Sequence, residues 1–145
     1  MNNQKNRINQ QIIVLGKSKL ALSKLLQAIK IVAPSADIAY FSSIEGAKSF
    51  FQERPDAEIS MIFSEQNLGK SESSSDFLRY CRERSPNAAL VILSQKQVHQ
   101  ITQFQPGKIS YLCIKEDISS FSNKIALFLT ESHNSDPILL KDVGT

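Results

Sequence analysis

The sequence has few residues of the kinds that often reveal a function directly. Its 145 residues include only two cysteines, Cys81 and Cys113, and two histidines, His99 and His133. The cysteines lack metal-type spacing, so we expect free thiols in a reducing compartment. Neither histidine has a ligand partner nearby in the sequence, and we therefore expect no metal site and no cofactor.

Long apolar runs and dense runs of charge are also missing. No apolar run approaches the roughly 20 residues that cross a bilayer, and the polar start, MNNQKNRINQQ, has no signal-peptide core. The formal net charge of +3 is spread along the chain without a basic cluster, so nothing calls for a nucleic-acid or membrane partner. We expect a cytoplasmic protein.

What the chain does have is a regular alternation of short apolar runs and amphipathic segments. The short runs are β-branched and almost continuously apolar, which is typical of strands buried on both faces of a sheet. They predict strands at 11–15, 36–41, 58–63, 89–93 and 109–114. Helical spacing of apolar residues predicts helices at 19–32, 42–54, 75–84, 95–104 and 118–132.

This alternation predicts an α/β domain. Each crossover is long enough to make neighbouring strands parallel, so we expect a doubly wound five-stranded parallel sheet with five flanking helices and the strand at 11–15 in its centre. Residues 1–10 are expected to be a flexible amino-terminal tail, 11–132 the domain, and 133–145 a carboxyl-terminal tail or linker. Ligands of such sheets bind beyond the carboxyl ends of the strands, which is where candidate site residues are sought.

The stretch QIIVLGKSK, at 11–19, ends in the Gly-Lys-Ser of a phosphate-binding loop. A complete loop has a further glycine five residues earlier, where this chain has Gln11 within an expected strand. The alternative is that Gly16 makes the strand-to-helix turn, Lys17 is solvated and Ser18 caps the helix. The match is too short to predict a nucleotide site.

The apolar runs that end in MIFSEQ, VILS and YLCIK place polar residues at the strand ends. In this order they resemble the receiver domain of bacterial response regulators, a flavodoxin-like or CheY-like fold. VILS places Ser94 at the hydroxyl position of that family, and YLCIK places Lys115 at its lysine position. The stretch MIFSEQNLGKSESSSDFLRYCRE is similar to the segment around the phosphoacceptor, which puts Glu65 there. The loop that follows is one residue longer than usual, so Ser64 is a second alignment.

The departures from the family concern its phosphotransfer chemistry. The two acids that hold Mg²⁺ in receivers are replaced by Gly16 and Lys17, which cannot ligate a cation, and the acceptor aspartate is absent. The resemblance therefore implies a pseudo-receiver and no enzyme. Glu65 would either reach Lys115 and, with Ser94, hold an active-like arrangement, or form a solvated ion pair worth about 0–1 kcal/mol. Lys17 would supply the charge of the missing Mg²⁺.

By this resemblance we expect a phosphorylation-independent regulatory domain that acts by protein–protein interaction in bacterial signal transduction or transcription control. The family uses its fourth helix, fifth strand and fifth helix as the output and dimer face, which corresponds to 95–104, 109–114 and 118–132. A protein partner or a second copy would contact apolar anchors there; the candidates are Val98, Ile101, Tyr111 and Phe121. The expected domain makes no direct contact with nucleic acid.

Two alternatives stay open at this point. The chain is a conventional phosphorelay response regulator, for which the sequence offers no acceptor aspartate near the end of the third strand. Or it is an anion or nucleotide sensor that uses the strand-end cleft with Lys17, Ser94 and Lys115.

Overall fold

The computed structural model describes residues 10–66, 74–95 and 109–133. Its strands are β1 (Gln11–Leu15), β2 (Asp37–Phe41), β3 (Ile59–Glu65), β4 (Ala89–Ser94) and β5 (Ile109–Cys113). Its helices are α2 (Lys19–Val32), α3 (Ile44–Glu53), α4 (Ser74–Arg84) and α5 (Ile118–His133). The strands form one sheet, in which every described pair is parallel.

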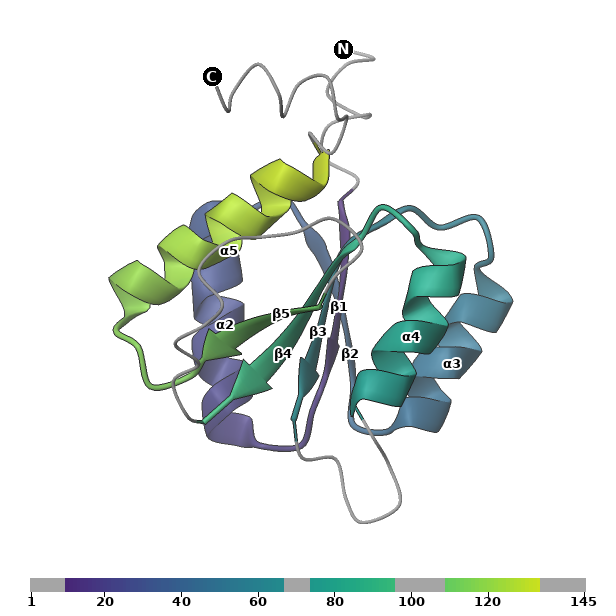
Figure 1. The fold of residues 1–145 in the computed structure, drawn as a ribbon, viewed down its shortest axis with the longest axis horizontal. Coiled ribbons are helices and arrows are strands. Elements are labelled where there is room, and N and C mark those ends of the chain that lie inside the picture. The colour runs from purple at the N-terminus through teal and green to yellow at the C-terminus, as the bar shows by residue number, and fades with distance from the viewer. Residues whose placement is uncertain (1–9, 67–73, 96–108, 134–145) are drawn as a thin grey trace.

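The order of strands in the sheet is β2-β1-β3-β4-β5. The second strand lies on one side of β1 and the later strands lie on the other, so the strand order reverses direction at β1. This confirms the predicted doubly wound parallel sheet. The middle strand is β3, and the expectation that β1 would be central is wrong because β1 has only β2 beyond it. Figure 1 shows the carboxyl ends of β1, β3 and β4 along one edge of the sheet, at the bottom of the view.

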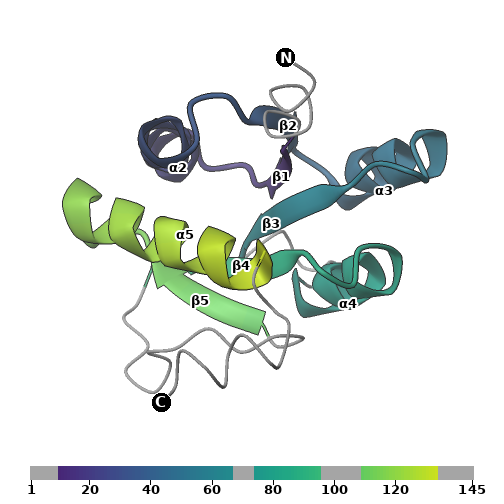
Figure 2. The ribbon, with the colours of Figure 1, turned by 90° about the horizontal axis from the view of Figure 1, so that it is seen from above.

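In the described residues, α2 and α5 cover one face of the sheet and α3 and α4 cover the other, as Figure 2 shows from above. Because side chains alternate along a strand, Ile12 and Val14 pack against α2 and α5, while Ile13 and Leu15 pack against α3 and α4. Both sets are fully buried. This two-sided burial explains why residues 12–15 of β1 form a continuous apolar run.

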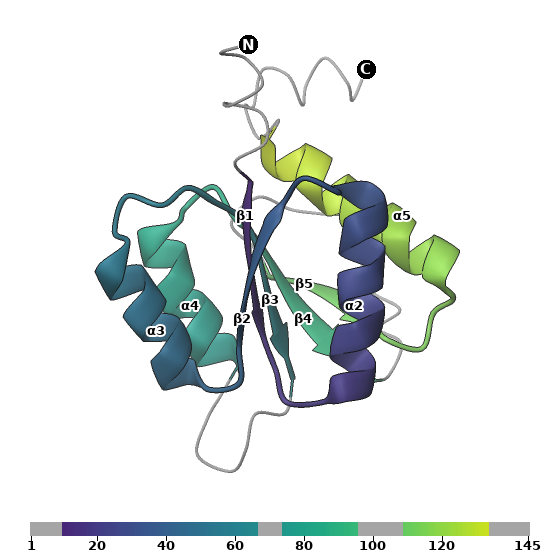
Figure 3. The same ribbon diagram turned by 180° about the vertical axis from the view of Figure 1, so that it is seen from behind.

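The helices adjoining β1 and β2 begin at serine caps. The Ser18 Oγ accepts a hydrogen bond from the Ala21 N–H at 3.3 Å, and the Ser43 Oγ accepts one from the Gly46 N–H at 3.1 Å. Such caps satisfy N–H groups that have no partner within the helix. The expected cap at Ser18 is therefore confirmed, and it fixes the start of α2 beside the end of β1 (Figure 3).

The third strand begins one residue later and ends two residues later than the sequence predicts. Ser64 and Glu65 were expected in a polar loop, but Ser64 pairs with Leu15 and Glu65 pairs with Leu93. Ladder pairing, with β1 and β4 at Ser64 and with β4 at Glu65, outweighs the polar side chains. The expected helix at 95–104 lies almost entirely outside the described residues. In the parts that are described, no helix is both long and apolar enough to cross a membrane.

Candidate functional site: a carboxylate at the β1–α2 turn

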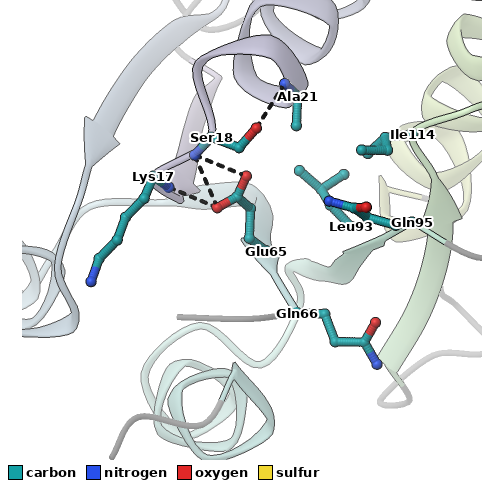
Figure 4. Close-up of a pocket in the computed structure, with 8 residues that line it drawn as sticks. All are labelled: Lys17, Ser18, Ala21, Glu65, Gln66, Leu93, Gln95 and Ile114. Atoms are coloured by element: carbon teal, nitrogen blue, oxygen red, sulfur yellow. Dashed lines mark hydrogen bonds between the residues drawn. The ribbon is translucent and has the colours of Figure 1, made fainter. Parts of the chain in front are cut away.

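A pocket of about 680 Å³ lies at the carboxyl edge of the sheet. It is bounded by the β1–α2 turn, the ends of β3 and β4, and the residue after β5 (Figure 4). The residues that line it are Lys17, Ser18, Ala21, Glu65, Gln66, Leu93, Gln95 and Ile114. Its position agrees with the rule that ligands of doubly wound sheets bind beyond the strand ends.

Glu65, the last residue of β3, provides the carboxylate of this pocket. Phe63 packs on the face covered by α2 and α5, so Glu65, two residues later, points to the same face. Its carboxylate accepts hydrogen bonds from the Lys17 N–H at 2.7 Å and from the Ser18 N–H at 3.2 Å. The residue is only 9% exposed, which strengthens these charge-assisted bonds.

The carboxylate also completes the amino-terminal end of α2. That helix has no acidic residue in its first turn, although a negative charge there is favourable beside the positive end of the helix dipole. Glu65 supplies the charge from another strand. Lys17 contributes its backbone, because Figure 4 shows its side chain pointing away from Glu65. The expected supply of the missing Mg²⁺ charge by the Lys17 ammonium stays a prediction.

Gly16 makes room for the Glu65 side chain. A Cβ on residue 16 would lie 2.8 Å from both the Cγ and the Cδ of Glu65 and 3.0 Å from its Oε1. The φ of Gly16 lies outside the left-handed region, so close contact, and not backbone freedom, requires a glycine. Its N–H donates to the Phe41 carbonyl, and its own carbonyl accepts from the Tyr40 hydroxyl, both at 3.0 Å.

No protein-family model matches this chain, and no curated protein sequence matches it either. Solved structures do. The signal receiver domain of an HD domain-containing protein from Pseudomonas fluorescens Pf-5 has a TM-score of 0.66 at 15% identity, over 88% of this chain and 91% of that one. A two component transcriptional regulator AraC from Clostridium phytofermentans has a TM-score of 0.63 at 15% identity, over 88% and 98%.

A response regulator from Thermotoga maritima has a TM-score of 0.63 at 14% identity, over 84% of this chain and 98% of that one. The chain has a response-regulator receiver fold. At this level of identity the likeness shows the fold alone. It does not assign the roles of individual residues at the strand ends.

Two other candidates for the receiver chemistry, Ser94 and Lys115, lie near the same edge. Ser94 ends β4 and is 3% exposed, and its carbonyl accepts from the Ile114 N–H at 2.9 Å. Lys115 is exposed. Within the described ranges the ion pairs join Arg79 to Asp76, Arg84 to Glu83 and Lys124 to Glu116. The expected ion pair between Glu65 and Lys115 is therefore wrong, since the Glu65 carboxylate turns to the β1–α2 N–H groups.

The alternative acceptor position, Ser64, is fully buried. It lies one residue before Glu65, so its side chain points to the opposite face of the sheet. Its hydroxyl donates to the Glu65 carbonyl at 3.1 Å. Ser64 thus contacts the backbone at the end of β3 on the face away from the pocket, and Glu65 is the residue that lines the pocket.

The β5–α5 turn is held by Lys24 and Glu116, to which the sequence assigned no role. The Lys24 ammonium donates to the carbonyls of Ile114 and Glu116. Glu116 accepts from Ser120 and Lys124, both at 2.6 Å. Burial of Glu116 works against its ionisation, but these hydrogen bonds outweigh it and hold its pKa below the usual range.

The expected output face is described only in part. Val98 and Ile101 lie outside the described residues. Tyr111 is half-buried against the α3–α4 side. Phe121 is fully buried in the core between the sheet, α2 and α5. The expectation that Phe121 is an exposed anchor is wrong, because it lies on the inner side of α5 with Ile125 and Phe128.

Proposed function

We propose that this chain is a phosphorylation-independent, receiver-like regulatory domain that acts through protein contacts in bacterial signal transduction or transcription control. The receiver fold and the sequence resemblance supply the class. The observation that carries the proposal is the Glu65 carboxylate, fixed by the Lys17 and Ser18 N–H groups in the space above Gly16. It lies where the resemblance expects a phosphoacceptor, and its oxygens are already engaged.

The chemistry of neighbouring residues supports the same proposal. Mg²⁺ takes oxygen ligands, and phosphoryl transfer depends on such a cation to balance developing charge. Gly16 offers no side-chain oxygen, and Lys17 adds a positive charge. Among the described residues no group of three or more His, Cys, Asp or Glu side chains is arranged to hold a metal ion.

A phosphorylation assay tests the proposal. The purified chain and a conventional receiver domain are each incubated with acetyl phosphate and Mg²⁺, and intact mass is measured. We expect one phosphoryl group on the conventional domain and none on this chain. A stoichiometric, Mg²⁺-dependent phosphoryl adduct on this chain would refute the proposal and favour the conventional phosphorelay regulator. Glu65→Gln would then show whether residue 65 carries the adduct.

Contact with a protein partner is supported by apolar side chains on the surface. The exposed large apolar residues in the described ranges are Leu20 and Ile31 on α2, Tyr40 on β2 and Leu127 on α5. One similar structure is a complex of CheY6 with the phosphorylated P1 domain of CheA3 from R. sphaeroides, with a TM-score of 0.56 at 11% identity. We propose that α5, through Leu127, belongs to the contact surface.

The homodimer form of this proposal has a direct test. The mass of the native chain in solution is measured by light scattering and compared with that of Leu127→Asp and of Leu20→Asp. If two copies meet through α5, the native chain is dimeric, Leu127→Asp is monomeric and Leu20→Asp, on α2, remains dimeric. A monomeric native chain would leave a different protein as the proposed partner.

A second candidate function, a small-ligand sensor, is favoured by the pocket of about 680 Å³ beside Glu65. A thermal-shift screen with nucleotides and simple anions at several salt concentrations would separate it from the first. A saturable shift at constant ionic strength would favour the sensor.

A further inference from the structure

The β1–α2 turn binds a carboxylate almost entirely through its backbone. Two successive N–H groups, those of Lys17 and Ser18, point to the Glu65 oxygens. The amino-terminal end of the 14-residue helix α2 follows immediately, and no acidic side chain of its own lies in the first turn. Paired N–H groups at a helix start form a favourable environment for oxyanions of any source.

The bound carboxylate is an observation independent of the helix end. Glu65 comes from β3, 48 residues along the chain from Lys17. Its side chain packs directly over Gly16, where any side chain would collide with it. It is nine-tenths buried, a costly place for a charge without such partners. The turn therefore already holds an anion that the protein itself supplies.

The site also has room for a free ligand. Glu65 forms one wall of the pocket of about 680 Å³, and Figure 4 shows Gln66 and Gln95 at other parts of its lining. Removing the Glu65 carboxylate would leave the two N–H groups directed into that space. A small tetrahedral oxyanion is the ligand class that such a pair of donors takes.

We propose that the β1–α2 turn is an oxyanion-binding site and that Glu65 is its built-in occupant, which excludes free phosphate from the native pocket. A second anion close to Glu65 would meet both charge repulsion and N–H groups that are already bonded. The biological meaning of this inference rests on the proposed function, because it gives the physical reason why this edge does not respond to phosphate.

Titration with inorganic phosphate tests the inference, with chloride used to hold ionic strength constant. The native chain is compared with Glu65→Ala and with Glu58→Ala, an exposed acid at the opposite end of β3. Both variants lose one negative charge, so the second controls for general attraction of anions. Binding is followed by thermal shift and by the amide resonances of Lys17 and Ser18.

We expect Glu65→Ala to bind phosphate about tenfold or more tightly than the native chain, since two charge-assisted hydrogen bonds become available. The Lys17 and Ser18 amide resonances should shift on titration, while Glu58→Ala should behave as the native chain does. Equal affinity in all three proteins would overturn the inference, as would binding that leaves these two resonances unchanged.

A second variant of residue 65 and the phosphorylation assay complete the test. If Glu65→Ala does not fold, Glu65→Ser keeps a polar side chain that is too short to occupy the N–H groups, and phosphate binding no tighter than native would overturn the inference. The phosphorylation assay on the native chain is separate. A phosphoryl adduct there would refute the proposed function without changing the affinity of the Glu65 variants for phosphate.

Discussion

Gly16→Ala is the substitution that most directly tests the geometry of the site. The added Cβ would lie 2.8 Å from two carbons of Glu65, whereas carbon atoms normally approach to about 3.5–4.0 Å. The Glu65 side chain must therefore move and release the Lys17 and Ser18 N–H groups. Hydrogen bonds to a charged group contribute about 1.5–3 kcal/mol each. Because the turn is partly exposed, water can bond to the released N–H groups and recover part of this free energy. We expect a loss of about 2–3 kcal/mol in the free energy of unfolding.

A double-mutant cycle separates this mechanism from a general cost of alanine. Glu65→Ala alone removes the same hydrogen bonds and should cost a similar amount. Once Glu65 is shortened, the Cβ at residue 16 has nothing to strike, so the double variant should be about as stable as either single one. This corresponds to a coupling of about 2 kcal/mol. Urea denaturation of the four proteins measures it, and losses that add to within about 0.5 kcal/mol would refute the contact.

Gly46→Ala is the matched control for this cycle. Its Cβ would lie 3.2 Å from the Ser43 Oγ and 3.5 Å from a ring carbon of Phe41, which is tight but not prohibitive. Alanine is also favoured over glycine within a helix by about 1 kcal/mol. These opposing effects should leave Gly46→Ala within about 1 kcal/mol of the native chain, whereas Gly16→Ala falls well below it.

Three further predictions concern the rest of the described fold. Lys24→Met should lower the free energy of unfolding by about 1–3 kcal/mol, because two carbonyls of the β5–α5 turn lose their donor; the exposed Lys30→Met should change it by less than about 0.5 kcal/mol in the same urea titration. Because the pKa of Glu116 is lowered in the folded state, its stabilisation is present above its unfolded pKa of about 4.3 and declines as the pH falls through the folded pKa. The stability difference between native chain and Glu116→Gln should therefore shrink from about pH 6 to about pH 3, and a constant difference would contradict it. Burial raises the pKa of the Cys81 thiol to about 12, so a disulfide reagent should label Cys81 in native Cys113→Ala at the rate of unfolding; labelling at the rate of a free thiol would show that Cys81 is accessible.

The sheet was predictable because local sequence patterns indicate each of its strands. Ile12, Ile13, Val14 and Leu15 form an unbroken apolar run, and each is fully buried between two helix layers. The caps at Ser18 and Ser43 are likewise local signals, since a serine oxygen reaches an N–H three residues later. Features that depend on neighbours within one element were therefore recovered from the sequence.

The site was less predictable because it depends on contacts between distant elements. The glycine at 16 was interpreted as the loss of a metal ligand, while the structure adds a second reason: it leaves space for Glu65. No local pattern shows where a side chain 48 or 49 residues away will turn. The pairing of Glu65 with Lys115 was inferred from their positions in the receiver resemblance, and the nearer backbone N–H groups compete successfully for the same carboxylate.

Phe121 illustrates the same difficulty on a helix. The face of α5 that meets the sheet is set by how the helix docks beside α2, and the output face taken from the family resemblance gave the wrong side for this residue. Lys24 was overlooked because a lysine on an amphipathic helix is normally solvated. Here its ammonium reaches the carbonyls after β5 and lies 5.1 Å from the centre of the Phe121 ring.

The two interpretations of Gly16-Lys17-Ser18 are connected by the structure. The phosphate-loop resemblance was rejected for want of a second glycine, yet the N–H groups of Lys17 and Ser18 do bind an anion. The receiver resemblance predicted a missing metal site at Gly16 and Lys17, and the carboxylate that faces this turn belongs to Glu65, the residue that the same resemblance predicts at the acceptor position. Because Glu65 is one methylene longer than aspartate, it can fold back to the turn, and it can do so only where residue 16 has no side chain. Glycine at 16 and glutamate at 65 therefore form one unit, in which an internal carboxylate takes the place that a bound anion would otherwise fill.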